Sequence, residues 1–104
     1  MSQPSKTNTS LRHIVMWTLK DEAEGRTKAE NMLKAREVLM SCAALVPGIE
    51  LFEVGLKSDG LDCTCDVILN STFKDAQALA AYQVHPDHLA IKPFMKAIVA
   101  QRQC

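Results

Sequence analysis

The sequence is short of net charge, of long apolar runs and of residues that break regular structure. Its 104 residues include 12 Lys and Arg against 12 Asp and Glu, with only four glycines and four prolines. Without an excess of basic side chains to neutralise phosphates, nucleic-acid binding has little support. No apolar run approaches the roughly 20 residues that a membrane-spanning helix needs. Residues 1–10 are polar and lack the apolar core of a signal peptide, so we expect a disordered tail there and a cytoplasmic protein.

The sequence also lacks the motifs of common cofactor and metal sites. It has no Gly-rich phosphate loop and no Ser-His-Asp order. His85 and His88, together with Cys63 and Cys65, offer the donor atoms that zinc prefers. Their spacing matches no zinc motif, however, and the proline between the two histidines keeps them off one continuous helix. We therefore expect no metal and no cofactor.

A disulfide framework is missing as well, although the chain has four cysteines: Cys42, Cys63, Cys65 and Cys104. Cys63 and Cys65 are two residues apart on an expected strand, where their side chains share a face roughly 7 Å apart. That spacing is poor for a mutual disulfide. We interpret the cysteines as buried free thiols in a reducing compartment.

What the sequence does have is 47% hydrophobic residues arranged with strand and helix periods. The length suits one domain, which we place at residues 11–104. The patterns predict a strand over 11–20, a helix over 26–46, strands over 49–57 and 62–72, a helix over 74–84 and a strand over 97–104. Turns are expected over 21–25 and 58–60, and a short helix over 88–96, interrupted or started at Pro93. This order is that of a ferredoxin-like split β-α-β domain of the α+β class.

The first expected strand has apolar residues on both faces. His13, Val15 and Trp17 alternate with Ile14 and Met16, so both faces need a cover. Helices of the same chain cover one face, and in a chain of this length a second copy is the natural cover for the other. We therefore expect a homodimer that forms through the open face of the sheet.

The densest titratable chemistry lies at residues 82–88, which read Tyr-Gln-Val-His-Pro-Asp-His. The segment holds two of the three histidines and the only tyrosine of the chain. Pro86 has no N–H to donate and disfavours helical backbone at His85, so the preceding helix should end near Val84 or His85.

With the segment Ser-Thr-Phe-Lys-Asp at residues 71–75, this motif resembles the stress-responsive A/B barrel (Dabb) family of small dimeric α+β barrel proteins. The resemblance runs from Leu11 onward and is also carried by residues 11–20, 46–49 and 54–55. It implies a ferredoxin-like domain that forms a homodimeric α+β barrel. Most members of the family have no assigned activity. Their last strand usually runs several residues beyond the position of Cys104, so we expect a shorter final strand here.

The resemblance to one enzyme of this fold family, a polyketide cyclase, implies catalytic roles for two residues of the motif. That enzyme closes a ring by aldol condensation with a tyrosine and a histidine from a motif similar to residues 82–88. The match implies that His88 acts as general base and Tyr82 as the partner of a substrate carbonyl. A pocket histidine of its first strand matches His13, whereas a further pocket histidine of its third strand is replaced by Val67.

Three hypotheses for function remain open. The leading one is a family member without assigned activity that binds a small apolar or aromatic molecule between sheet and helices, with His13, Trp17, Val67 and His85 as binding residues. The second is a polyketide-cyclase-like enzyme with His88 and Tyr82 as catalytic residues. The third is a structural stress protein without a ligand, in which His13 and Tyr82 are hydrogen-bonded core groups and His85 braces a helix turn.

Overall fold

The computed structural model describes residues 10–58, 60 and 63–104. Residues 1–9 of the expected tail over 1–10, the centre of the expected turn at residue 59 and the expected strand start at residue 62 lie outside this range. The strands and helices, in chain order, are β1 (Leu11–Leu19), β2 (Glu22–Ala23), β3 (Arg26–Thr27), α1 (Lys28–Met40), β4 (Ile49–Leu56), β5 (Val67–Phe73), α2 (Ala76–Val84), α3 (Pro86–Ile98) and β6 (Val99–Gln103).

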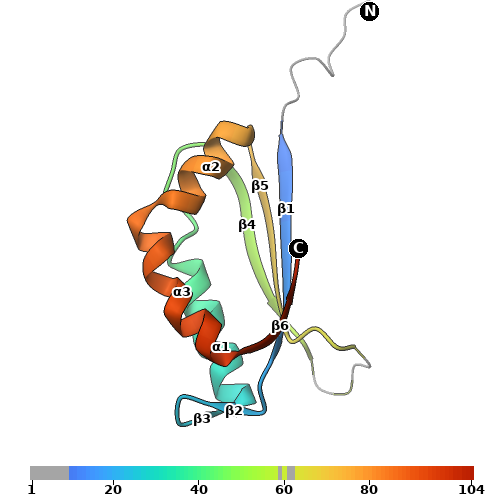
Figure 1. Ribbon diagram of the computed structural model, residues 1–104. Helices are drawn as coiled ribbons and strands as arrows, with labels where there is room; N and C mark the ends of the chain where they lie inside the picture. The colour runs from blue at the N-terminus through green and yellow to red at the C-terminus, as the bar shows by residue number, and fades with distance from the viewer. Residues whose placement is uncertain (1–9, 59, 61–62) are drawn as a thin grey trace, which may run out of the picture.

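Within these residues, the main sheet has four strands in the order β4-β5-β1-β6, and every neighbouring pair is antiparallel. In the central pair Leu11 lies opposite Phe73 and Trp17 opposite Val67. Figure 1 shows the sheet nearly edge-on, with α1, α2 and α3 all on one side of it. This arrangement confirms the predicted ferredoxin-like α+β fold. None of the described helices is long and apolar enough to cross a membrane.

The two faces of β1 have opposite environments. Val15, Trp17 and Leu19 face the helices and are buried, as the alternation of the strand predicts. Ile14 and Met16 face the other way and remain 38% and 37% exposed. The outer side of the sheet therefore has no cover within one copy of the described chain (Figure 1).

The first helix is shorter than the predicted 26–46 at both ends. Arg26 and Thr27 belong to a small hairpin instead, in which β3 pairs with β2 where only a turn was expected. Thr27 then starts α1 through a capping box with Glu30, in which each side chain binds the backbone N–H of the other residue. Beyond Met40 the chain continues as turns rather than helix.

The loop after α1 ends at Gly48, which fixes the start of α2. Gly48 has φ of 104°, a backbone conformation that L side chains rarely adopt. A Cβ placed there would lie 2.9 Å from the Cβ of Ala78 in α2. The Gly48 carbonyl also accepts a hydrogen bond from the N–H of Lys74. Only glycine lets the loop pass this close to the helix that carries Tyr82.

Two further predictions of element bounds are wrong. β5 begins at Val67, because the described residues 63–66 before it do not form a strand. Cys63 and Cys65 precede the strand. Only Cys42 of the four expected buried thiols is buried, since Cys63 and Cys104 are exposed and Cys65 is half-buried. The short helix expected within 88–96 is the longer α3, and Pro93 lies inside it. The helix begins with a proline because its first residues need no N–H partner.

Candidate ligand-binding site

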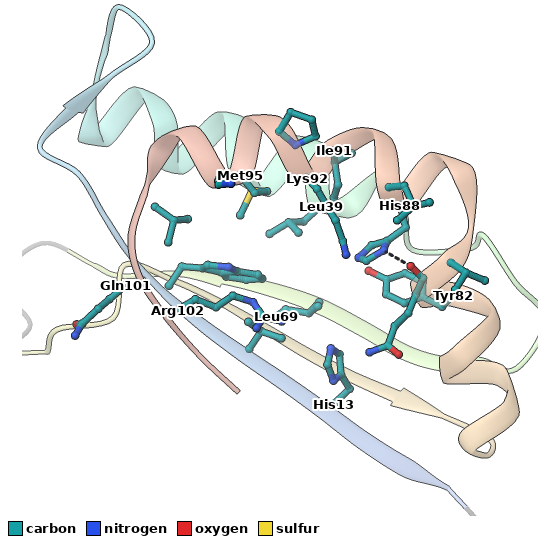
Figure 2. A pocket seen from close by; sticks show the side chains of 18 of the residues that line it. His13, Leu39, Leu69, Tyr82, His88, Ile91, Lys92, Met95, Gln101 and Arg102 are labelled. Atoms are coloured by element: carbon teal, nitrogen blue, oxygen red, sulfur yellow. Dashed lines mark hydrogen bonds between the residues drawn. The ribbon is translucent and has the colours of Figure 1, made fainter.

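A cavity of about 1190 Å³ lies between the inner face of the sheet and the helices α2 and α3. Figure 2 shows side chains reaching into it from both sides. His13, Val15 and Trp17 line it from β1, and Arg102 from β6. Its volume is above the range of roughly 300–1,000 Å³ that is typical of ligand pockets.

Tyr82 forms one end of the cavity and is held rigidly by other aromatic rings. Its ring centroid lies 5.2 Å from that of Phe73, 6.0 Å from that of Phe52 and 4.5 Å from that of His88. The residue is only 1% exposed, and its hydroxyl points into the cavity (Figure 2). Burial raises the pKa of the phenol further above its ordinary value of 10.0. The hydroxyl therefore stays protonated at neutral pH and is able to donate a hydrogen bond to a ligand.

His88 is oriented by the main chain of α2. Its Nδ1 lies 3.1 Å from the carbonyl oxygen of Gln83 (Figure 2). A carbonyl oxygen only accepts hydrogen bonds, so Nδ1 carries the proton and Nε2 of the neutral ring keeps its lone pair. Burial lowers the pKa of His88; the Gln83 bond opposes this in part, and the charges of Lys92 and Arg102 add to the lowering. The imidazole is therefore neutral at pH 7 and has a basic nitrogen.

His13 reaches the same cavity from the sheet. Its ring packs edge-on against Phe73, with ring centroids 6.4 Å apart. Burial lowers its pKa, and the charges of Arg102 and His88 lower it further. His13, His88 and Arg102 all line this one cavity.

The predicted site residues divide into two groups. The structure brings His13, Trp17, Tyr82 and His88 together in the cavity lining. Val67 lies outside the lining, because it is fully buried in the apolar cluster that contains Val15 and Trp17.

His85 is also absent from the lining and has a structural role. Its Nδ1 accepts a hydrogen bond of 3.1 Å from the N–H of Asp87, so the side chain caps the first turn of α3. The expectation that Val67 and His85 bind the ligand therefore does not agree with where the structure places them.

Several lining residues were not predicted from the sequence. Four of the α3 residues that line the cavity recur at intervals of three and four residues and so share one helix face: His88, Ile91, Lys92 and Met95. Leu89, Pro93 and Lys96 line it beside them. This pattern is visible in the sequence once the helix is known to continue through Pro93. Arg102 lies opposite Trp17 in the β1–β6 pairing, so it shares the inner face of the sheet.

The charge of the lining is of one sign. Lys92, Lys96 and Arg102 line the cavity, and no Asp or Glu is among the described residues that do so. Among all described residues, no group of His, Cys, Asp and Glu side chains is arranged to hold a metal ion.

Comparison with known proteins gives one family and several similar structures. The sequence profile of the Stress Responsive A/B Barrel Domain matches residues 11–104. A dimeric protein of unknown function with a ferredoxin-like fold from Bacteroides fragilis is 26% identical, covers 92% of each chain and superposes with a TM-score of 0.78. A Dabb family protein from Mesorhizobium loti is 24% identical over 90% of each chain, with a TM-score of 0.62.

A third similar structure, a dimeric ferredoxin-like protein of unknown function from a Jannaschia species, is 31% identical. The match covers 78% of this chain and 77% of that one, with a TM-score of 0.57. No curated protein is significantly similar to this chain in sequence.

Proposed function

The chain belongs to the stress responsive A/B barrel domain family, and we propose that it is a homodimeric protein whose cavity binds a small apolar or aromatic molecule. The observation that carries this proposal is the cavity itself. Its walls are largely apolar side chains, and the polar groups of Tyr82, His88 and His13 converge on it. A concave, mostly apolar site with a few convergent polar groups is what small-molecule sites have in common.

A titration of tryptophan fluorescence with small aromatic compounds tests this proposal. Trp17 is the only tryptophan of the chain and lines the cavity, so a bound ligand should change its emission. Calorimetry on Ile91→Trp then locates the site, because a larger side chain on the α3 wall takes up ligand space. We expect an affinity loss of about tenfold or more, equivalent to about 1.4 kcal/mol. Leu33→Trp is the matched control, since Leu33 is 56% exposed on α1 and does not line the cavity. Equal affinity of the two variants would contradict the proposed location.

A second candidate function is proton abstraction from an acidic carbon, and the pairing of Tyr82 with His88 favours it. In such a step His88 Nε2 takes the proton from a carbon next to a carbonyl, and the electron pair moves onto the carbonyl oxygen. The Tyr82 hydroxyl donates a hydrogen bond to that oxygen. Attack of the carbanion on a second carbonyl closes the ring in an aldol step without any net oxidation or reduction, and the proton returns to the new alkoxide.

Deuterium exchange at the acidic carbon of a diketone, followed by NMR in heavy water, tests this candidate directly. His88→Ala should slow the protein-dependent exchange by about 10²- to 10⁴-fold, the usual contribution of a general base. Tyr82→Phe should slow it as well while leaving diketone binding detectable. Exchange that proceeds equally well in His88→Ala would leave binding as the function of the site.

The open face of the sheet supports the homodimer. Two of the solved structures most similar to this chain are dimeric. Ile14 and Met16 sit exposed at the centre of this face in one copy, and burying them needs a partner surface. Ile14→Lys should convert a dimer to a monomer in sedimentation equilibrium, because it places a charge in the buried interface. Leu33→Lys is the matched control on α1. A dimer that tolerates Ile14→Lys would exclude this face as the interface.

A further inference from the structure

We propose that the ligand is an anion, an apolar or aromatic carboxylate whose acid group binds between Lys92 and Arg102. This inference rests on the proposed ligand-binding function and adds the chemical class of the ligand to it. The starting observation is a separation of charge. The whole chain has equal numbers of acidic and basic residues, yet the described cavity lining has Lys92, Lys96 and Arg102 and no acid.

Lys92 and Arg102 enter the cavity from opposite walls. Lys92 lies on α3, one helical turn after His88, and Figure 2 shows its side chain directed into the cavity towards His88 and Tyr82. Arg102 lies on β6 opposite Trp17 and reaches along the sheet. Both residues line the cavity and both are exposed to solvent, so they lie on the side of the cavity that solvent reaches. An acid group held there leaves the apolar part of the ligand to fill the interior.

Neither cation has an acidic partner among the described residues. The ion pairs within 4 Å in the described part of the chain are those of Lys28 with Asp21 and Asp66. Arg102 Nη1 donates to Cys104 Sγ at 3.4 Å, and a thiol sulfur is a weak acceptor. The guanidinium therefore keeps most of its planar set of donors for a carboxylate, which it binds through two parallel hydrogen bonds.

The charges also act on the histidines of the site. Lys92 and Arg102 both lower the pKa of His88, and Arg102 lowers that of His13. The cavity thus has a positive potential even when both imidazoles are neutral. A bound carboxylate offsets this potential, whereas a bound cation or a neutral amide does not.

Calorimetry with two ligands of equal shape tests the proposal: para-butylbenzoate, which is an anion at pH 7, and para-butylbenzamide, which is neutral. We expect the benzoate to bind about fivefold more tightly than the benzamide at low salt, because two solvent-exposed charge interactions together supply about that gain in affinity. The preference should shrink as salt is raised, since exposed charges are screened. Lys92→Gln and Arg102→Gln should each reduce benzoate affinity more than benzamide affinity, so that the preference for the anion is lost. The control is Arg36→Gln, which removes one positive charge from an exposed position of α1 outside the cavity.

The outcomes separate this inference from the proposed function. Loss of the benzoate preference in Lys92→Gln and Arg102→Gln, but not in Arg36→Gln, supports an anion site. Equal binding of both ligands to the unaltered protein overturns the anion site and leaves the apolar binding cavity standing. Binding of neither ligand, with no change in Trp17 fluorescence, overturns both.

Discussion

Replacing Tyr82 in two ways separates its structural role from its role in the cavity. The ring is 1% exposed and packs against three other rings, whereas the hydroxyl points into the cavity (Figure 2). No hydrogen bond from this hydroxyl to the described part of the chain is formed. Tyr82→Phe keeps the ring and its packing and removes only the hydroxyl, so we expect the free energy of unfolding to change by less than about 1 kcal/mol.

Tyr82→Ala removes the ring and should cost about 3–5 kcal/mol, in the range found for large aromatic side chains deleted from a core. The loss includes the offset and edge-on ring contacts, each worth about 0.5–1.5 kcal/mol beyond simple burial. Because small domains are stable by only about 5–15 kcal/mol, Tyr82→Ala should remove a large fraction of the total free energy of unfolding. The functional tests therefore use Tyr82→Phe rather than Tyr82→Ala.

Urea denaturation followed by Trp17 fluorescence measures both variants. All samples need the same protomer concentration, because the stability of a dimer depends on it. If Tyr82→Phe lowers the free energy of unfolding by more than about 2 kcal/mol, the hydroxyl is not free for a ligand, because a loss of that size is the cost of leaving a buried hydrogen-bond partner unpaired. The hydroxyl would then be a core group, and the carbonyl-binding role would be lost with it.

Three further predictions concern the frame of the site. Gly48→Ala should lower the free energy of unfolding by about 2–4 kcal/mol in urea denaturation, because the residue has positive φ and its Cβ would clash with α2. Gly25→Ala is the control and should cost less, since Gly25 also has positive φ but open space around it. Equal costs would argue against the clash. Asp66→Asn should lower the free energy of unfolding by about 1.5–3 kcal/mol, because the buried Asp66 carboxylate accepts a hydrogen bond of 2.8 Å from a backbone N–H. Asp21→Asn is the control and should change it by less than about 0.5 kcal/mol, since Asp21 is fully exposed. A similar loss in both variants would count against the buried bond. The pKa of His88 is lower in the folded than in the unfolded chain, so on acidification the unfolded chain takes up the proton at a higher pH. The contribution of neutral His88 to the free energy of unfolding is therefore complete above pH 6.5 and is lost as the pH falls through the folded pKa. His88→Gln should therefore flatten the fall in stability measured below pH 6.5, and an unchanged slope would contradict the assignment.

The sequence predicted the fold well because local patterns and the global arrangement agree. The alternation in β1 correctly placed Val15 and Trp17 on one face and Ile14 on the other; the structure shows that the first face is the buried one. Such alternation is a direct consequence of strand geometry and needs no knowledge of tertiary contacts. The order of elements then leaves few topologies, and the ferredoxin-like one was confirmed.

The first helix was predicted too long at its N-terminal end because that end depends on side-chain contacts with the small hairpin before it. Asn31 is fully buried in α1 and ties the helix to the hairpin by accepting from Arg26 Nε and donating to the Ala23 carbonyl. Helical periodicity does not report such contacts. A local signal was nevertheless present, because Thr27 and Glu30 form the Thr-x-x-Glu pattern of a capping box.

The sequence predicted only part of the site, because the rest depends on tertiary contacts. Tyr82 and His88 belong to a recognisable motif, His13 follows from the resemblance to an enzyme of the fold family, and Trp17 shares the strand face of His13 by alternation. Val67 was assigned to the pocket by analogy with a single position, and only the packing of the apolar cluster shows that it is covered. Arg102 depends on the β1–β6 register, which includes an irregularity between Thr18 and Leu19 that no sequence pattern announces.

The break between α2 and α3 explains why the motif takes the form Tyr-x-x-His-Pro-x-His. In one continuous helix, residues six positions apart lie roughly 120° from each other around the axis, so Tyr82 and His88 would face different directions. His85 instead has extended backbone, with φ −61° and ψ 134°, and serves as both the C-cap of α2 and the N-cap of α3. Pro86 favours this conformation at the preceding residue and occupies the first position of α3, where no N–H is needed. The chain therefore turns between the two helices, and the rings of Tyr82 and His88 meet at 4.5 Å. The same turn leaves the Gln83 carbonyl free to accept from His88 Nδ1, so one backbone feature both brings the two side chains together and sets which imidazole nitrogen is basic.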